Sequence, residues 1–278
     1  MVHNFIAFIR EANELLQQEI DLSPANQRVA GIISRLSLQL KTRYMPEEVQ
    51  LVLNNEYIRD NLRSLQEKLS DAEFLEELTN SRRLYESKDS ALDIIARLPN
   101  WNVYIALVRE ELSALRQFNR PETYSDSQPL VFVGSGPLPL SPIIMHLLGG
   151  VDVICIEKDS AAYEASCALL EKMGLMNHVT VVLNDGAEFD YSCYNRVFVA
   201  SLVRNKLDVI DQISRTSDNP LIAVRTAEGM KQIMYESIDE MQLNRQGWRI
   251  SGRTSPERQL VINSTLFLQR AAAHAVRN

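Results

Sequence analysis

The chain has 278 residues, of which 45% are hydrophobic and 23% charged, with a formal net charge of -7. This length suits one large domain or two smaller ones with real cores. An acidic chain without a basic stripe is not expected to bind nucleic acid. Its three cysteines are widely spaced. It shows no signal-peptide pattern and no membrane-length apolar run, so we expect a cytoplasmic protein.

The first 120 residues predict a helical domain. Apolar residues recur at helical spacing from Phe5 to Leu16 and again from Asn61 to Leu84. Ser23-Pro24 and Pro46 are expected to begin helices, because proline is favoured in a first helical turn and serine just before it. The segment from Trp101 to Phe118 predicts the last helix of this domain.

A polar, proline-flanked segment at 120–129 predicts a linker, after which strands and helices alternate. This alternation predicts an α/β fold with a parallel, doubly wound sheet, in a Rossmann-like domain over 121–278. One helix is expected over 160–173, with Gly174 at its C-terminal cap. Five strands are expected at 130–133, 151–156, 179–183, 195–200 and 220–224. An antiparallel pair is expected near the C-terminus, from 248–250, 260–262 and 266–268.

The most informative segment is 130–140, where an apolar run ends in Gly134-Ser135-Gly136. This is the pattern of a buried strand that feeds a glycine turn at a nucleotide site. Pro137 and Pro139 stand where a dinucleotide-binding loop has its third glycine. NAD is therefore disfavoured, and another adenosine ligand is favoured. The loop also lacks the lysine of a phosphate-binding loop, which disfavours ATP hydrolysis.

Polar or small residues follow each of the first four expected strands, where open α/β sheets bind ligands. Glu157 can accept hydrogen bonds from ribose hydroxyls, and Asp185 can accept one from an adenine amino group. Each feature alone is weak, but four in order favour S-adenosylmethionine. We expect contacts to this ligand from Gly134, Ser135, Gly136, Pro137, Leu138, Glu157, Asp185, Gly186, Ala200, Ser201 and Leu202.

The loop Gly134-Ser-Gly-Pro-Leu-Pro-Leu140 resembles the Gly-Pro-Leu-Pro-Leu loop of nicotianamine synthases and of their bacterial relatives in opine-metallophore synthesis. Arg225-Thr226, Gly229-Met230 and Tyr235 resemble a second signature of that family. The resemblance covers most of the chain and implies a helical domain before an S-adenosylmethionine-binding domain. It also implies transfer of the 3-amino-3-carboxypropyl (aminobutyrate) arm to an amine, with release of methylthioadenosine.

An acceptor amine is protonated near neutral pH and needs a base at the mouth of the site. The resemblance points to Glu77 as that base, with Glu76 second, and to Tyr104 as a catalytic tyrosine. Judged on residue pattern alone, the two glutamates belong to an acidic run that could be a solvated helix face. Tyr104 could equally be a core residue with a satisfied hydroxyl.

Arg225, beside Thr226 at a strand end, is expected to clamp an α-carboxylate of donor or acceptor in a bidentate pair. A surface salt bridge is the alternative. Tyr235 is expected at the pocket wall. None of the four histidines has ligand spacing, and we expect no cluster of histidine, cysteine and carboxylate and no metal site.

The bacterial branch implies histidine as acceptor, a single transfer, and an opine dehydrogenase as the downstream partner. Three alternatives stay open. Repeated transfer would make nicotianamine and needs a roomier pocket; methyl transfer would release adenosylhomocysteine; and a helical interaction module could carry a vestigial adenosine domain.

The chain also offers a possible homodimer contact on its first helix. Phe5, Ile6, Phe8 and Ile9 could pack against a second copy of the chain, although packing inside the helical domain is the default.

Overall fold

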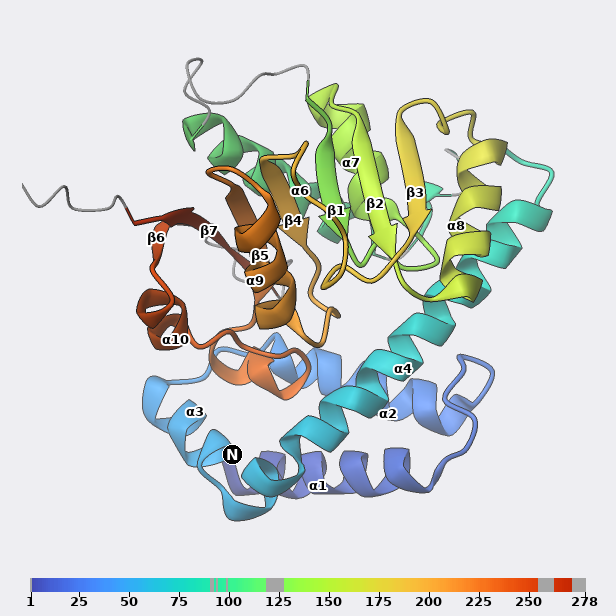
Figure 1. Ribbon diagram of the computed structural model, residues 1–278. Helices are drawn as coiled ribbons and strands as arrows, with labels where there is room; N and C mark the ends of the chain where they lie inside the picture. The colour runs from blue at the N-terminus through green and yellow to red at the C-terminus, as the bar shows by residue number, and fades with distance from the viewer. Residues whose placement is uncertain are drawn as a thin grey trace, which may run out of the picture.

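The computed structural model describes residues 2–90, 93, 95–98, 100–118, 128–254 and 263–271. A layer of helices lies below a 7-stranded sheet that carries further helices (Figure 1). The helices that precede the sheet are α1 (Val2–Gln18), α2 (Gln27–Leu40), α3 (Pro46–Leu53), α4 (Glu56–Glu86) and α6 (Trp101–Phe118). No helix in these ranges is long and apolar enough to cross a membrane.

The sheet half confirms the expected alternation. Its elements are β1 (Leu130–Val133), α7 (Leu140–Gly149), β2 (Val153–Glu157), α8 (Ser160–Lys172), β3 (Val179–Leu183), β4 (Arg196–Val199), α9 (Lys206–Thr216), β5 (Leu221–Thr226), η1 (Gly229–Ile233), α10 (Glu240–Arg245), β6 (Trp248–Arg253) and β7 (Ser264–Arg270). Gly174 follows α8 with φ +68, as expected of a left-handed cap.

The strands lie in the order β3-β2-β1-β4-β5-β7-β6. The first five run parallel, and β7 pairs antiparallel with both β5 and β6. This confirms the doubly wound sheet and its antiparallel pair, although 260–262 lies outside the described residues. The order reverses between β1 and β4, and ligands of such sheets bind outside the carboxyl ends of the strands at this point.

The start of α2 differs from the sequence prediction. The helix begins at Gln27, and the side chain of Asn26 accepts hydrogen bonds from the N–H groups two and three residues further on. Ser23-Pro24 lies in the turn before it, where Asn26 N–H donates to the Ser23 carbonyl at 3.0 Å. The prediction was wrong because asparagine caps these otherwise unpaired N–H groups as well as serine does. Pro46 begins α3 as predicted.

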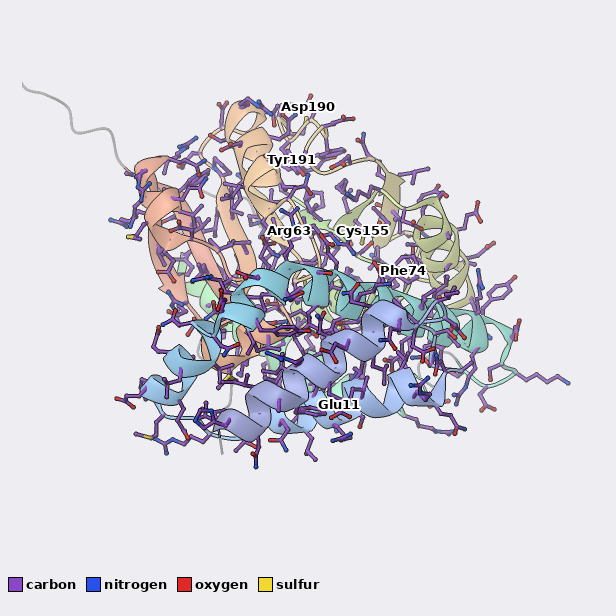
Figure 2. All side chains as sticks on the ribbon, turned by 90° about the horizontal axis from the view of Figure 1, so that it is seen from below. Glu11, Arg63, Phe74, Cys155, Asp190 and Tyr191 are labelled. Carbon is purple, nitrogen blue, oxygen red and sulfur yellow. The ribbon has the colours of Figure 1, made fainter. Side chains whose placement is uncertain are left out.

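The helical layer has its own core, built from the apolar faces of α1 to α4. Phe5 and Ile9 are buried in it, which confirms packing inside the helical domain as their environment. Met230 and Ile233 of η1 belong to the same core, so the sheet half contributes to the helical layer. Seen from below in Figure 2, α1 and α4 lie across the near side of the molecule, with Phe74 on α4.

Two helices join the halves. α4 runs from the helical layer to the side of α8 (Figure 1), where the Ser81 hydroxyl donates to the Ala165 carbonyl at 3.3 Å. α6 packs in the core of the sheet, with Leu112 and Leu115 in one cluster with Phe132. Helices that precede the expected boundary near residue 120 therefore pack against elements that follow it. Most of the expected linker lies outside the described residues.

Candidate active site

A cavity of about 660 Å³ lies between α2 and α4 on one side and the carboxyl ends of β1, β2, β4 and β5 on the other. This volume is typical of small-molecule sites. The residues predicted from the sequence that line it are Glu76, Glu77, Tyr104, Gly134, Ser135, Gly136, Leu138, Glu157, Asp185, Gly186, Ala200, Ser201, Leu202, Arg225 and Tyr235.

Two predicted contact residues do not line the cavity. Pro137 is buried in the turn that leads into α7. Thr226 is also buried, and its hydroxyl accepts a hydrogen bond from the Ile238 N–H at 3.0 Å. The Thr226 hydroxyl therefore binds the backbone of the segment after β5. A direct contact from Thr226 to a ligand had been expected instead.

The glycine loop after β1 brings the backbone close to other groups. Gly134 and Gly136 have φ of +79 and +69, which favour glycine. A Cβ on Gly134 would lie 2.5 Å from Val203 Cγ2, and one on Gly136 would lie 2.7 Å from Glu77 Oε2. The Val203 side chain therefore packs against Gly134, and the Glu77 carboxylate lies directly over Gly136.

Glu157, at the end of β2, is fixed by two backbone groups. Its Oε2 accepts from the Gly136 N–H at 2.8 Å, and its Oε1 accepts from the Asp159 N–H at 2.9 Å. A carboxylate has about four acceptor positions, so two remain for a ligand. The geometry fits the predicted role of accepting from ribose hydroxyls.

Asp185 lies in the turn after β3. Its Oδ1 accepts from the Ala187 N–H at 2.9 Å, and its Oδ2 lies 3.9 Å from Lys158 Nζ. Tyr191, labelled in Figure 2, stabilises the turn, because its hydroxyl donates to the Gly186 carbonyl at 2.8 Å. Asp185 thus lines the cavity on a well-supported turn, as expected of an adenine contact.

Glu77 on α4 and Tyr104 on α6 form the first carboxylate–tyrosine pair of the cavity. The Tyr104 hydroxyl donates to Glu77 Oε1 at 3.4 Å. Burial, reinforced by the nearby Glu73 carboxylate, raises the pKa of Glu77 well above its usual value. A raised pKa makes the ionised carboxylate a better proton acceptor. Glu76 also lines the cavity and is more exposed than Glu77.

A second pair lies one helical turn earlier, and sequence reasoning missed its acid. The Tyr235 hydroxyl donates to Glu73 Oε2 at 3.0 Å. Burial, with a smaller contribution from the Glu76 carboxylate, raises the pKa of Glu73 to about 7. The available signal was the spacing of four between Glu73 and Glu77, which puts both on one face of α4.

Arg225 lies at the cavity but its guanidinium is already engaged. Its Nε and one terminal nitrogen donate to the two oxygens of Glu111, both at 2.9 Å, and that nitrogen also donates to Ser141 Oγ at 2.9 Å. The bidentate pairing expected for a ligand carboxylate is thus made with a buried glutamate of α6. Sequence reasoning missed Glu111 because nothing in the apolar pattern of α6 marks its partner.

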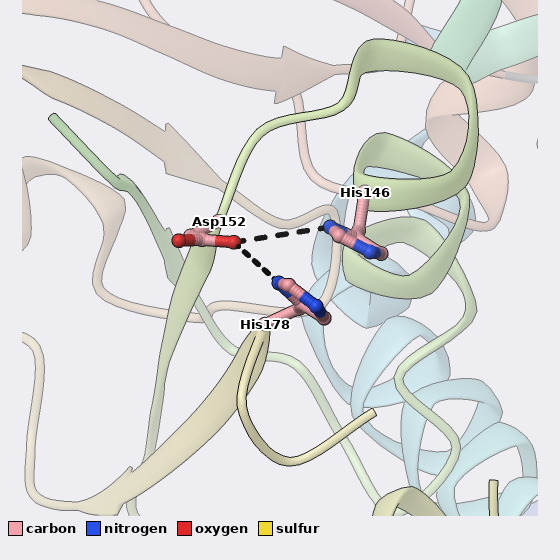
Figure 3. Close-up of side chains that lie close together, drawn as sticks. All are labelled: His146, Asp152 and His178. Atoms are coloured by element: carbon pink, nitrogen blue, oxygen red, sulfur yellow. Dashed lines mark hydrogen bonds and ion pairs between the residues drawn. The ribbon is translucent and has the colours of Figure 1, made fainter. Parts of the chain in front are cut away.

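The structure brings together one cluster that the sequence did not predict, formed by His146, Asp152 and His178 at the opposite end of β2 from the cavity (Figure 3). The His178 Nδ1 lies 2.9 Å from Asp152 Oδ1, and His146 Nδ1 lies 4.0 Å from it. The two rings are stacked with an interplanar angle of 17°. The ligand atoms of the three side chains all lie within 4.8 Å of one another, so the expectation of no such cluster was wrong.

The family model described as nicotianamine synthase protein matches residues 2–275. The chain belongs to the nicotianamine synthase family. Nicotianamine synthase 3 of Oryza sativa subsp. indica is 28% identical over 201 residues, which cover 66% of this chain and 55% of the rice protein. The matched region thus spans little more than half of that relative.

Other members of the nicotianamine synthase family give a similar result. Nicotianamine synthase 2 of Arabidopsis thaliana is 24% identical over 253 residues, which cover 84% of this chain and 77% of the plant protein. The MtNAS structure in complex with MTA and tNA has a TM-score of 0.79 and 22% identity, and covers 95% of this chain and 97% of MtNAS.

A mutant of MtNAS in complex with S-adenosylmethionine also has a TM-score of 0.79, with 21% identity, and covers 96% of this chain and 98% of MtNAS. At this identity the likeness shows that the two proteins share a fold over 96% of this chain. That fold consists of N-terminal helices followed by one mixed sheet.

Proposed function

We propose that this protein transfers the 3-amino-3-carboxypropyl group of S-adenosylmethionine to the α-amine of histidine and releases methylthioadenosine. The observation that carries the proposal is the Glu77 carboxylate, held beside the Tyr104 hydroxyl and directly over Gly136 of the nucleotide-type loop. A base at this position faces the place where a bound sulfonium ligand and an amine would meet.

The cavity fits S-adenosylmethionine as the donor. The glycine loop lines the cavity, Glu157 keeps acceptor positions for ribose hydroxyls, and Asp185 lines the cavity from the next strand end. MtNAS, which shares the fold, has been solved with this compound. Membership of the family supports the same donor here.

The reaction needs one proton acceptor. S-adenosylmethionine supplies a carbon bonded to a positive sulfur; the acceptor nitrogen bonds to this carbon as the carbon–sulfur bond breaks, and the bond pair stays on sulfur as a neutral thioether. Before that step, Glu77 takes one proton from the ammonium group of the acceptor. The positive charges of both substrates favour the ionised form of Glu77, and Tyr104 keeps its carboxylate oriented.

The acceptor and its pathway rest on the resemblance to the opine-metallophore branch. Histidine would receive one aminobutyrate unit, and an opine dehydrogenase would then act on the product. Repeated transfer to give nicotianamine is the second candidate, because the curated relatives that match the chain are nicotianamine synthases.

Mass spectrometry of the purified protein with S-adenosylmethionine and single amino acids tests the proposal. We expect methylthioadenosine and a histidine heavier by one aminobutyrate unit, from one or both enantiomers. Glu77→Gln should bind the donor yet lose most turnover, about 100-fold or more, because general-base catalysis contributes on this scale. Adenosylhomocysteine would instead identify a methyltransferase, and products with two or more units would identify nicotianamine synthesis.

A further inference from the structure

The cavity extends past the proposed base toward the helical layer. Glu73 and Glu77 lie one turn apart on the same face of α4, and both line the cavity. Four residues of α-helix rise about 6 Å, so the two carboxylates define two positions along one groove. Glu77 lies over the nucleotide-type loop, whereas Glu73 faces Tyr235, in the segment after β5.

The far position is a built polar site with apolar walls. Tyr235 fixes one oxygen of Glu73 through a hydrogen bond of 3.0 Å, and the remaining acceptor positions of the carboxylate stay available. Ile33 of α2 and Met234 line the same end of the cavity. Met234 is held by a contact of 3.7 Å from the Ser37 hydroxyl to its sulfur.

We propose that Glu73 and Tyr235 form the subsite for the acceptor's side chain, in which Glu73 accepts a hydrogen bond from a ring N–H. Glu73 is then a specificity-determining residue, distinct from the base. The inference rests on the proposed transfer to an amino acid, and it explains why an imidazole would be selected.

The spacing supports this assignment. With the α-amine at Glu77, the side chain of the same amino acid has to cover about one helical turn to reach Glu73, and the reach of a histidine is of this order. Ile33 and Met234 line the cavity and can give the ring apolar contacts, while the carboxylate takes its polar edge. An apolar side chain of equal size would leave Tyr235 as the hydrogen-bond donor to Glu73 and would satisfy none of its remaining acceptor positions, which costs binding energy.

A carboxylate at this position also suits a positively charged ring. Its charged and titratable neighbours are Glu76 and Glu77 on α4, Tyr104 on α6, and Tyr235; Lys41, directly after α2, also lines the cavity. Burial and the carboxylate neighbours raise the pKa of Glu73 to about 7, so an N–H donor or a cation would relieve an unfavourable charge.

The test compares histidine with β-(2-thienyl)alanine, whose five-membered ring has a similar shape and no N–H. For wild type, Glu73→Gln and Tyr235→Phe, kcat/KM is measured for both acceptors at saturating S-adenosylmethionine. We expect Glu73→Gln to reduce the preference for histidine about tenfold or more, mainly through KM for histidine. Tyr235→Phe should reduce it less. KM for S-adenosylmethionine should stay within about twofold of wild type.

Glu67→Gln is the matched control, because Glu67 lies on the same helix, forms an exposed pair with Arg63 at 3.4 Å and does not line the cavity. An unchanged preference in Glu73→Gln overturns the inference. So does an equal fall of kcat with both acceptors, which would make Glu73 part of the proton transfer. A wild-type protein that transfers nothing to histidine overturns the proposed function itself, and this inference with it.

Discussion

Gly136 is the residue at which the backbone, the proposed base and the cavity meet. Its N–H donates to Glu157, its φ is +69, and a Cβ there would lie 2.7 Å from Glu77 Oε2. Such a contact is too short to persist, so the carboxylate or the loop would have to move. The absence of a side chain at this position therefore sets where the base can lie.

Gly136→Ala should lower turnover roughly 100-fold, since a displacement of about 1 Å at a reacting group has effects of this size. Gly150→Ala is the control: Gly150 has a similar φ of +64, but a Cβ there would meet nothing within 4 Å. The measurement is kcat with histidine, together with the melting temperature of each variant. Equal losses of activity in both variants would assign the effect to backbone strain alone.

Single residues also mark the limit of sequence reasoning. Glu77, Tyr104, Glu157 and Asp185 were placed correctly at one cavity, because loop and family signatures fix their positions in the chain. Glu73 escaped notice, because an acidic run on one helix does not reveal which carboxylates face inward. Only the position of α4 across the cavity from the strand ends distinguishes it from its exposed neighbours.

At the scale of elements, one buried ion pair ties four of them together. Arg225 of β5 and Glu111 of α6 are both buried, and the pair is completed by Ser141 of α7 and Thr265 of β7. The Thr265 hydroxyl donates to Glu111 Oε1 at 2.6 Å. This network fixes the end of β5 at the cavity, so its effect on catalysis is through the position of the strand.

Glu111→Gln should cost about 3–5 kcal/mol of unfolding free energy, because it leaves the Arg225 charge buried without a counter-ion. Glu67→Gln, which removes an exposed pair on α4, should cost less than about 0.5 kcal/mol. Urea denaturation followed by circular dichroism measures both. A loss below 1 kcal/mol for Glu111→Gln would mean that water or another group compensates the arginine.

The elements themselves were largely predictable. Period-two and period-3.6 patterns gave α6 with its observed bounds and the five parallel strands to within two residues, whereas β6 runs three residues further than expected. The start of α2 was missed because two capping signals compete within four residues, and local pattern does not rank them. The place of α6 in the sheet core could not be predicted, since it depends on contacts between residues more than 100 positions apart, such as Glu111 and Arg225.

At the scale of the whole molecule, the fold brings several carboxylate side chains together around one cavity. The chain has a net charge of -7, and Glu73, Glu76, Glu77 and Glu157 all line the space between the helical layer and the sheet. Burial, with a smaller contribution from repulsion by neighbouring carboxylates, raises the pKa values of Glu73 and Glu77. In the ligand-free protein, ionisation of these carboxylates is therefore unfavourable, and two positively charged substrates would make it more favourable.

The raised pKa of Glu73 should make the unfolding free energy depend on pH. The pKa of Glu73 is raised from 4.5 to about 7 in the folded protein. Between these values the folded protein keeps a proton that the unfolded chain has lost, so the unfolding free energy falls as pH rises through this window. The loss from Glu73 is on the order of 3 kcal/mol, and Glu77 acts in the same direction.

Glu73→Gln should escape this part of the loss. Urea denaturation of the ligand-free proteins from pH 4.5 to 8 should show the variant gaining stability relative to wild type as pH rises, with a plateau above pH 7. Glu67→Gln should give a curve parallel to wild type, because its carboxylate is exposed. If the curve of Glu73→Gln is also parallel to wild type, the Glu73 carboxylate is solvated in the ligand-free protein and its pKa is not raised.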